Sequence, residues 1–379
     1  MQLRFMRRER ETMERFLPGL DAALENCDWQ SLENPGSPGI KHFRTHGGPA
    51  LVVPLEHSGK GADALQAVRV QRALGSRSPS LAVATTMHHF SVASLLEAYQ
   101  LSQGMEWMLL ESIAHDRLLV ASGFAEGIPG RGILSPTMSA EPATDGILIS
   151  GTKKPCSLSH SMDLLTVSVS VPLKSGKGQQ MAVAVVPAQS PGVRVEAFWG
   201  TPALAGAESH AVVLESVAVP EDLLVRIDPE TEGRMDALQT AGFIWFELLM
   251  TASYLGAASA LAEQVLREAN ASSEAQAAVL CELESAMGAV EGVALRTAGD
   301  LAGDDALVAT LICRYTAQGA IGRTVRRCVE MLGGMAFVRN PRIAYLLSCT
   351  DALAFHPPSR LRMATSLHHW YAGAPLLMT

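Results

Sequence analysis

Leu164-Leu-Thr-Val-Ser-Val-Ser-Val-Pro172 lies near the middle of the 379-residue chain and is its clearest strand. From Leu165 to Val171, leucine and valine alternate with one threonine and two serines. Because successive side chains of a strand point to opposite faces, this alternation predicts a half-buried strand. The middle of the chain is therefore predicted to hold a β-sheet.

Further strand candidates lie on both sides of this one, each bounded by glycine or proline. They cover residues 117–122, 146–151, 180–187, 192–198 and 211–219. Short strands at regular spacing are typical of a small antiparallel barrel or sandwich. We expect residues 118–228 to form a middle β-barrel domain.

The sequence on either side of this region has the apolar spacing of helices. Before it, helices are predicted over 62–75, 80–101 and 104–115; after it, over 242–270, 274–302, 305–332, 340–354 and 359–371. Gly333-Gly334 and Pro357-Pro358 end two of them, as helix-terminating residues do. We expect an N-terminal helical domain over 1–117 and a C-terminal helical bundle over 229–379, so the fold class is α+β.

Composition excludes several classes of protein. Hydrophobic residues make up 48% of the chain and charged residues 18%, which is too apolar for a disordered chain. The net charge of −8 argues against a nucleic-acid partner, which would require a basic face. The most apolar run, 243–262, contains Glu247, so no membrane span is expected. Six scattered cysteines without a CxxC pair, together with a charged start, predict a cytoplasmic protein.

Six short stretches carry a resemblance to a known family. In chain order they are Val53-Pro-Leu-Glu-His-Ser-Gly-Lys-Gly61, Phe124-Ala-Glu-Gly127, Gly151-Thr-Lys-Lys-Pro-Cys-Ser157, Ser190-Pro-Gly-Val193, Leu214-Glu-Ser-Val-Ala-Val-Pro220, and Met331-Leu-Gly-Gly-Met335 with Asn340-Pro-Arg-Ile343. Together they resemble the sequence markers of the acyl-CoA dehydrogenase superfamily across nearly the whole chain.

This resemblance implies a helical N-terminal domain, a middle antiparallel β-barrel and a C-terminal four-helix bundle, with FAD in the cleft between them. It also implies a homodimer or homotetramer. The implied reaction is the α,β-dehydrogenation of an acyl thioester carried by CoA or by an acyl carrier protein. In that reaction a carboxylate removes the α-proton and the β-hydrogen leaves as hydride to the flavin.

The resemblance assigns residues to the flavin ring. Ser157 matches a residue whose hydroxyl and backbone bond the ring near N5, and Cys156 is its neighbour in the same strand. Phe124 and Ala125 would offer backbone groups to the pyrimidine edge. A packing role for Cys156 and an ordinary strand-end role for Ser157 are the alternatives.

Three more residues are matched to the other half of the cofactor. Gly333 and Gly334 would let the backbone approach the FAD of a neighbouring subunit, or would simply end a helix. Ser359 would reach the adenosine half.

Two residues are candidates for the catalytic base. Glu247 is the only charged residue between Asp236 and Glu263, but it falls one residue past the family's helix-borne base, and Phe246 takes that place. His356 occupies the loop position where many relatives carry glutamate. The alternative for Glu247 is a carboxylate paired with an arginine across a helix interface, and that for His356 is a loop residue bonded to backbone.

The chain also departs from the family. An R-x-x-F-G turn that holds the FAD diphosphate is replaced by Arg267-Glu-Ala-Asn-Ala-Ser-Ser-Glu274, and Pro155 stands where the family has tryptophan. Two other functions therefore remain open: a flavin-dependent monooxygenase on the same fold, and a flavin-poor scaffold subunit of a heteromeric dehydrogenase. No metal site is expected, because the histidine doublets 88–89 and 368–369 lack ligand spacing.

Overall fold

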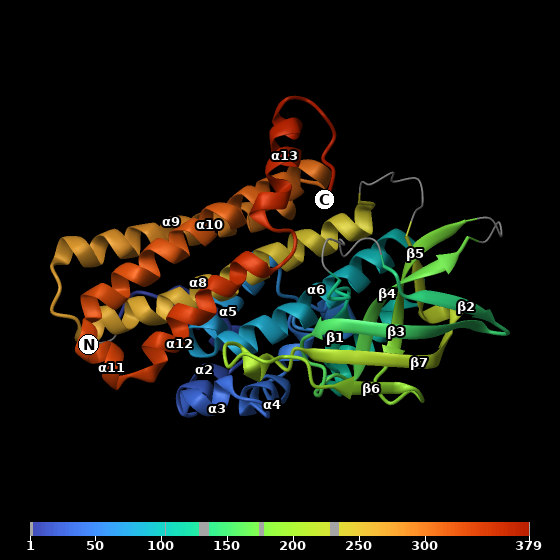
Figure 1. The fold of residues 1–379 in the computed structure, drawn as a ribbon, viewed down its shortest axis with the longest axis horizontal. Coiled ribbons are helices and arrows are strands. Elements are labelled where there is room, and N and C mark those ends of the chain that lie inside the picture. The colour runs from blue at the N-terminus through green and yellow to red at the C-terminus, as the bar shows by residue number, and fades with distance from the viewer. Residues whose placement is uncertain (1–2, 103, 129–135, 174–177, 228–234, 379) are drawn as a thin grey trace.

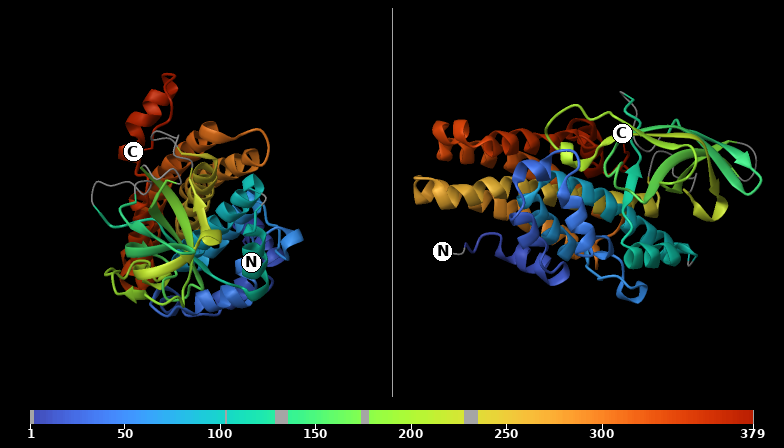
Figure 2. Two further views of the ribbon diagram at one scale, coloured as in Figure 1. Left: turned by 90° about the vertical axis from the view of Figure 1, so that its right-hand side faces the viewer. Right: turned by 90° about the horizontal axis from the view of Figure 1, so that it is seen from below.

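A computed structural model gives the structure of residues 3–102, 104–128, 136–173, 178–227 and 235–378. Helices occupy the first part of the chain, strands lie between Val120 and Arg226, and helices return from Ala237. Long helices form one end of the molecule and the sheet forms the other, an arrangement visible in two perpendicular views (Figures 1 and 2). This order of elements is the predicted one.

The first helical part contains seven helices in the described residues. They are α1 (Arg7–Phe16), α2 (Leu20–Glu25), α3 (Trp29–Glu33), α4 (Pro38–Thr45), α5 (Ala64–Arg77), α6 (Pro79–Ser102) and α7 (Glu106–Asp116), with short 3-10 turns at Gly48–Ala50 and Leu55–His57. A capping box between Asp63 and Gln66 starts α5, since each side chain bonds the backbone N–H of the other residue. The helices predicted over 62–75, 80–101 and 104–115 correspond to α5, α6 and α7.

The sheet has eight strands in the described part of the chain. They are β1 (Val120–Gly123), β2 (Ser139–Ala143), β3 (Gly146–Cys156), β4 (Leu164–Pro172), β5 (Gln179–Pro187), β6 (Val193–Glu196), β7 (His210–Pro220) and β8 (Leu224–Arg226), in the order β6-β7-β3-β2-β4-β5-β8, with β1 also pairing β4. The β1–β4 pair is parallel, and the β3–β7 and β4–β5 pairs are antiparallel.

The predicted closed barrel is wrong, because the sheet is open. Within the described residues β6 and β8 are its edges, and no ladder joins them. Closure requires strand number, tilt and register to agree around a ring. With only four and three residues, β6 and β8 are short edge strands, a length that limits further pairing.

The last helical part is built on the long helix α8 (Ala237–Glu268). It is followed by α9 (Ser273–Thr297), α10 (Gly303–Leu332), α11 (Gly334–Arg339), α12 (Pro341–Thr350), a 3-10 turn at Asp351–Phe355 and α13 (Arg360–Tyr371). A second capping box, between Asp236 and Gln239, begins α8. An 18-residue window of α8 is apolar enough to cross a membrane, but 89% of that window is buried inside the protein, as expected of a core helix.

The C-terminal helices pack on one another and also on helices of the N-terminal part. Helix α8 packs most extensively against α5, α10 and α6, so helices from both ends of the chain share one core. Glycines allow the closest approach: a Cβ atom on Gly256 of α8 would lie 2.2 Å from the carbonyl oxygen of Arg72 in α5, and one on Gly75 would lie 2.1 Å from that of Ser253. The two helix backbones therefore touch at this crossing.

A buried arginine ties the same helices together. The Arg72 guanidinium donates to Glu9 of α1 at 2.9 Å, to Ser259 of α8 at 3.1 and 3.2 Å, and to Glu284 of α9 at 2.6 Å. Its side chain is fully buried, so these bonds replace the water that the guanidinium loses.

Candidate active site

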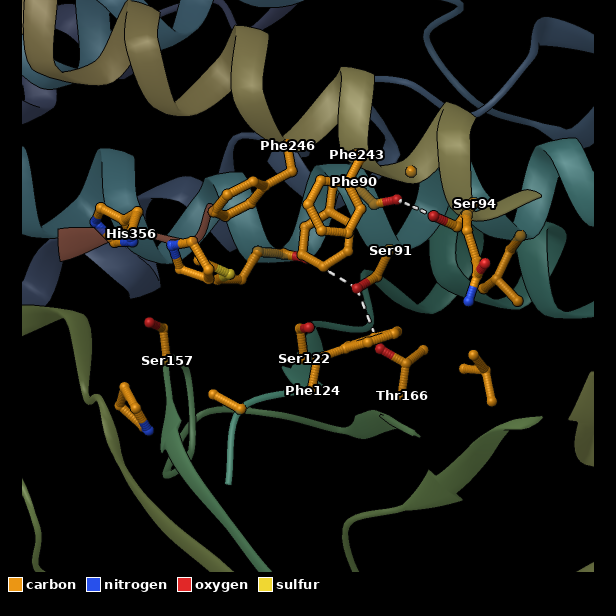
Figure 3. Close-up of a pocket in the computed structure, with 18 of the residues that line it drawn as sticks. Phe90, Ser91, Ser94, Ser122, Phe124, Ser157, Thr166, Phe243, Phe246 and His356 are labelled. Carbon is orange, nitrogen blue, oxygen red and sulfur yellow. Dashed lines mark hydrogen bonds between the residues drawn. The ribbon is translucent and has the colours of Figure 1, made fainter. Parts of the chain in front are cut away.

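A cavity of about 180 Å³ lies where α6 and α8 face the sheet. In Figure 3 the helix residues Phe90, Phe243 and Phe246 lie on one side of it, and Ser157 and Thr166 from the strand side lie on the other. Further lining comes from α6, from the ends of β1 and β3 and the residues that follow them, from β5 and β8, from the segment 199–209, and from the loop that carries His356. The cavity is thus assembled from all three parts of the chain.

The described lining of this cavity is mostly apolar or hydroxylic, with Gln239 and His356 as its other polar side chains, and has no Asp, Glu, Lys or Arg side chain. Hydroxyl groups come from Ser91, Ser94, Ser122, Thr166, Ser157 and Ser209. Several of them already have partners, including Ser91 with Thr166 at 3.2 Å and Ser94 with the Phe90 carbonyl at 2.9 Å (Figure 3). The site can bond a small polar group while offering no counter-charge to an ion.

Strand β4 reaches the cavity with the face that was predicted to be solvated. Thr166 lines the cavity, and Ser168 accepts a hydrogen bond from the Lys153 ammonium at 3.1 Å. Both residues are buried, so β4 is covered on both faces. Of the two faces of β4 that the alternation predicts, the apolar one lies in the core, and the polar one forms part of the wall of a cavity instead of facing water.

A second groove, of about 460 Å³, continues from the cavity toward the surface. The two share Phe124, Ala125, Pro155, Trp199 and His356 among their walls. Apolar walls of this kind suit a flat ring system. The groove also contains Lys154, whose ammonium lies 5.5 Å from the centre of the Phe198 ring.

Two peptide N–H groups at the junction of the cavity and the groove have no acceptor among the described residues. In the described residues neither the Ala125 N–H nor the Ser157 N–H donates to another group, while the Ala125 carbonyl accepts from the Lys154 N–H at 2.8 Å. Ser157 is buried, and a buried N–H without a partner is costly. A ligand with acceptor atoms at this junction would satisfy both donors.

A buried ion pair holds the segment that carries Phe124 and Ala125. The Lys153 ammonium lies 2.7 Å from the Glu126 carboxylate, which also accepts from the Thr137 and Met138 N–H groups. Burial alone would raise the pKa of Glu126, but these hydrogen bonds, chiefly from Lys153 and Thr137, lower it to about 2. Glu126 therefore stays ionised and joins the segment to β3 and to the start of β2.

Ser157 and Cys156, predicted together at the flavin ring, face different surroundings. The Ser157 hydroxyl lines the cavity and lies 3.0 Å from that of Ser209. The Cys156 thiol is fully buried against the Lys153 carbonyl, and burial raises its pKa to about 12. The Cys156 side chain is outside the described lining of either hollow and packs in the sheet.

Leu204, which forms part of the cavity wall, is held by residues that lie outside the cavity lining. Its N–H donates to the Tyr345 hydroxyl of α12 at 3.1 Å, and that hydroxyl bonds the carboxylate of Glu33. Glu33 also accepts from the Ser78 and Ser80 hydroxyls. Burial raises the pKa of Glu33, and these bonds oppose the rise.

His356 lies in the wall shared by the cavity and the groove. Its Nε2 is 2.9 Å from the hydroxyl of Tyr254. Burial raises the pKa of Tyr254 well above its usual value, so the phenol keeps its proton, and His356 Nε2 is its one acceptor in the described part of the chain. We assign the donor as Tyr254, which leaves the imidazole proton on Nδ1. Burial and the nearby Arg314 lower the pKa of His356 to about 3, so the ring is neutral.

Glu247 does not face the cavity. Phe246 lines it, while Glu247 is completely buried and lies 2.9 Å from the guanidinium of Arg314 in α10. One residue turns a helix by about 100°, which separates the two side chains. The predicted role of Glu247 as the base that faces the substrate is therefore not supported by its position, and the geometry is that of its alternative, a carboxylate paired with an arginine. Burial raises its pKa to about 7, and Arg314 opposes the rise.

The three residues matched to the outer half of the cofactor lie apart from the cavity. Gly333 and Gly334 join α10 to α11, at the end of the helices opposite the sheet (Figure 1). The Ser359 hydroxyl accepts from the Arg362 N–H at 3.4 Å and caps α13. Within this one chain all three residues act as helix ends.

Sequence reasoning missed Tyr254 and Arg314, which contact the His356 loop from two different helices. Tyr254 lies seven residues after Glu247, and so on the same face of α8, which was the only signal available. For Arg314 the sequence offered none. Among the described residues no cluster of three or more His, Cys, Asp or Glu side chains could hold a metal ion.

Comparison with known proteins gives one relative of nearly full length. The chain is 46% identical over 370 residues to an isobutylamine N-hydroxylase from Streptomyces viridifaciens, which covers 97% of this chain and 98% of that protein. It is also 28% identical over 181 residues to a dibenzothiophene monooxygenase from Rhodococcus qingshengii, which covers 48% of this chain and 42% of the other. No family model matches the chain.

Solved structures share the fold at low identity. FMN-bound TdsC from Paenibacillus sp. A11-2 superposes with a TM-score of 0.79 at 17% identity, covering 98% of this chain and 99% of the other. The prolyl acyl carrier protein oxidase AnaB superposes with a TM-score of 0.81 at 15% identity, covering 97% and 99%.

Proposed function

Since this chain belongs to the acyl-CoA dehydrogenase-like flavoprotein superfamily, we propose that it is a flavin-dependent monooxygenase that hydroxylates the nitrogen of a small aliphatic amine. Members of this superfamily are flavin-dependent oxidoreductases, and this chain is one. The finer assignment to amines is supported by the nearly full-length relative, an N-hydroxylase of isobutylamine.

The groove fits a flavin ring by the chemistry of its walls. The free N–H groups of Ala125 and Ser157 would donate to ring acceptors, and Phe124, Pro155 and Trp199 would bound its faces and edges. Bound there in its reduced form, the flavin would supply two electrons to O2, so that one oxygen atom enters the amine and the other leaves as water. The overall reaction is R–NH2 + O2 + reduced flavin → R–NHOH + H2O + oxidised flavin.

The uncharged cavity carries this proposal. A protonated amine would lose its water there without gaining a carboxylate, at a cost of several kcal/mol. Removing its proton at pH 7 costs about 5 kcal/mol for an ordinary primary ammonium. Only the neutral amine has the lone pair that attacks oxygen, so the cavity accepts the reactive form and excludes the unreactive one.

Named residues would have separate tasks in this reaction. The rings of Phe90, Phe243 and Phe246 would enclose the alkyl group and exclude water. The Nδ1–H of His356 would donate a hydrogen bond to a ligand oxygen at the boundary of cavity and groove. The hydroxyls of Ser122 and Ser157 would orient the amine nitrogen opposite this donor.

Dehydrogenation of an acyl thioester is less well supported. It needs a carboxylate base beside the α-carbon. The described lining of the cavity contains none, and Glu126, which lines the groove, is paired with Lys153. Carrier-protein substrates belong to a neighbour with only 15% identity, a level of likeness that concerns the fold alone. The scaffold-subunit alternative is also less well supported. A subunit that binds no flavin has no use for free N–H donors or an open groove at the flavin position, and this chain has both in its described residues.

The test is a single-turnover experiment. The protein is loaded with FMN or FAD, reduced without oxygen, and then mixed with aerated isobutylamine, and the N-hydroxylamine is measured by mass spectrometry. We expect hydroxylamine in proportion to the reduced flavin, with an ¹⁸O label from ¹⁸O2. Bleaching of the oxidised flavin by acyl thioesters without oxygen, and no hydroxylamine, would instead establish the dehydrogenase.

A further inference from the structure

We propose that the buried Arg314–Glu247 pair positions His356 in the active site, and that Glu247 serves this reaction through Arg314 and not as a base. The proposal rests on the proposed function only for its kinetic readout. It assigns a task to two buried charges near the cavity, neither of which lines it.

The Arg314 side chain binds backbone carbonyl groups of the segment that runs from the 3-10 turn to α13. Its guanidinium donates to the carbonyl oxygens of Leu353 at 3.0 Å, His356 at 2.6 Å and Pro358 at 3.0 Å. The neighbouring Tyr315 hydroxyl donates to the same Pro358 carbonyl at 2.9 Å. These bonds replace the helix or sheet bonds that this segment lacks, and they bracket His356 on both sides.

Glu247 compensates the buried positive charge of Arg314. The Arg314 side chain is 1% exposed, and its carboxylate partner is fully buried 2.9 Å away. A guanidinium bonded only to neutral carbonyls would remain an uncompensated charge, and removing one partner of such a pair is strongly destabilising. The carboxylate therefore fixes Arg314, and Arg314 fixes the loop.

Helix α8 holds the imidazole as well as the loop. Tyr254, two turns after Glu247, bonds Nε2 of His356, and the Phe246 ring centre lies 6.1 Å from that of the imidazole at a steep angle. One face of α8 thus fixes the backbone of His356 through Arg314 and its ring through Tyr254. With both fixed, Nδ1 is the ring nitrogen left for a ligand.

A double-mutant cycle distinguishes a positioning role of the Arg314–Glu247 pair from a contribution to packing alone. Glu247→Leu with Arg314→Met removes both charges at similar volume, a kind of replacement that often leaves stability unchanged. Arg326→Met is the matched control, because Arg326 is an exposed arginine of the same helix. Each change is made in the natural chain and again with His356→Ala.

Two readouts test the proposal. Amide hydrogen exchange of the flavin-free protein should accelerate at least tenfold at residues 353–356 in the charge-free variant, and not in Arg326→Met. For amine hydroxylation, the charge-free change should lower kcat/KM about 10²-fold when His356 is present, because a misplaced reacting group costs about this factor. In the His356→Ala background the same change should lower kcat/KM less than about threefold, because the side chain that the pair positions is already gone.

The outcomes are distinct. Unchanged exchange at residues 353–356, or an equal loss of kcat/KM in both backgrounds, would overturn the positioning role. If the unaltered protein makes no hydroxylamine, the proposed function fails, while the exchange measurement still decides whether the pair holds the loop. Should the charge-free variant not fold, Glu247→Gln, which keeps an acceptor for Arg314, is compared in the same way.

Discussion

Phe246 and Glu247 are adjacent in α8 and face different directions: the phenyl ring lines the cavity, and the carboxylate binds Arg314. An apolar ring thus occupies the place where dehydrogenation would require a base. In the proposed function, this ring shapes the volume in which the amine lies.

Phe246→Ala should shift substrate preference toward bulkier amines. The ring fills one side of a cavity of only about 180 Å³, and its removal opens space for additional methylenes, each of which is worth about 1–3 kcal/mol in a fitted pocket. We expect the ratio of kcat/KM for hexylamine over isobutylamine to rise at least tenfold. Phe337→Ala, in the exposed helix α11, is the control and should leave the ratio unchanged.

The pH dependence should follow the amine. Because the described cavity lining offers no counter-charge, kcat/KM should rise about tenfold per pH unit below the pKa of the substrate ammonium, which for an alkylamine is about 10.4. A less basic amine such as 2,2,2-trifluoroethylamine should reach its plateau at lower pH. Profiles that coincide for the two amines would place the titrating group on the protein and contradict binding of the neutral form.

The Glu126–Lys153 pair should control acid stability. The pKa of Glu126 in the folded protein is about 2, below the usual 4.5, so its contribution is complete above about pH 4.5 and is lost as the pH falls toward 2. Thermal unfolding between pH 2 and 7 should show a steeper loss of Tm for the natural protein than for Glu126→Gln. Glu141→Gln, a more exposed change in β2, should retain the steep acid limb.

The missing diphosphate turn should be visible in cofactor binding. Helix α8 ends at Glu268 and α9 begins at Ser273, so four residues make the connection, and Arg267 pairs only weakly with Glu263 at 4.0 Å. We expect FMN to bind at least as tightly as FAD and Arg267→Ala to change neither Kd, as measured by flavin fluorescence. A Kd for FAD tenfold below that for FMN, weakened by Arg267→Ala, would show that the arginine reaches the diphosphate.

Local patterns predicted the elements, and long-range pairing limited the prediction. Strand β4 and helices α5 to α7 have bounds close to those expected, because alternation, apolar periodicity and breakers lie within the segment itself. Strand β2 was missed because Ser139–Ala143 does not alternate and contains Pro142. The barrel was wrong because closure depends on register between strands far apart in the chain.

For the site, the sequence named some residues that line the cavity or groove and others that do not. Phe124, Ala125, Ser157 and His356 lie in these walls, and their roles toward a flavin or substrate stay predictions. Glu247 was misjudged because the phase of a helix is uncertain by one residue, which is enough to turn a side chain away. Partners such as Arg314 come from another helix, and no local pattern in the sequence announces them.

The four bonds of Arg72 have a consequence for synthesis of the protein. Its partners Ser259 and Glu284 follow it by 187 and 212 residues, so a chain that ends before α8 leaves Arg72 with Glu9 of α1 alone and leaves uncovered the side of α5 that packs on α8. The native core around Arg72 is therefore complete only when the last third of the polypeptide is present. Fragments that stop before α8 should accumulate in inclusion bodies, a point to respect when choosing truncations for expression.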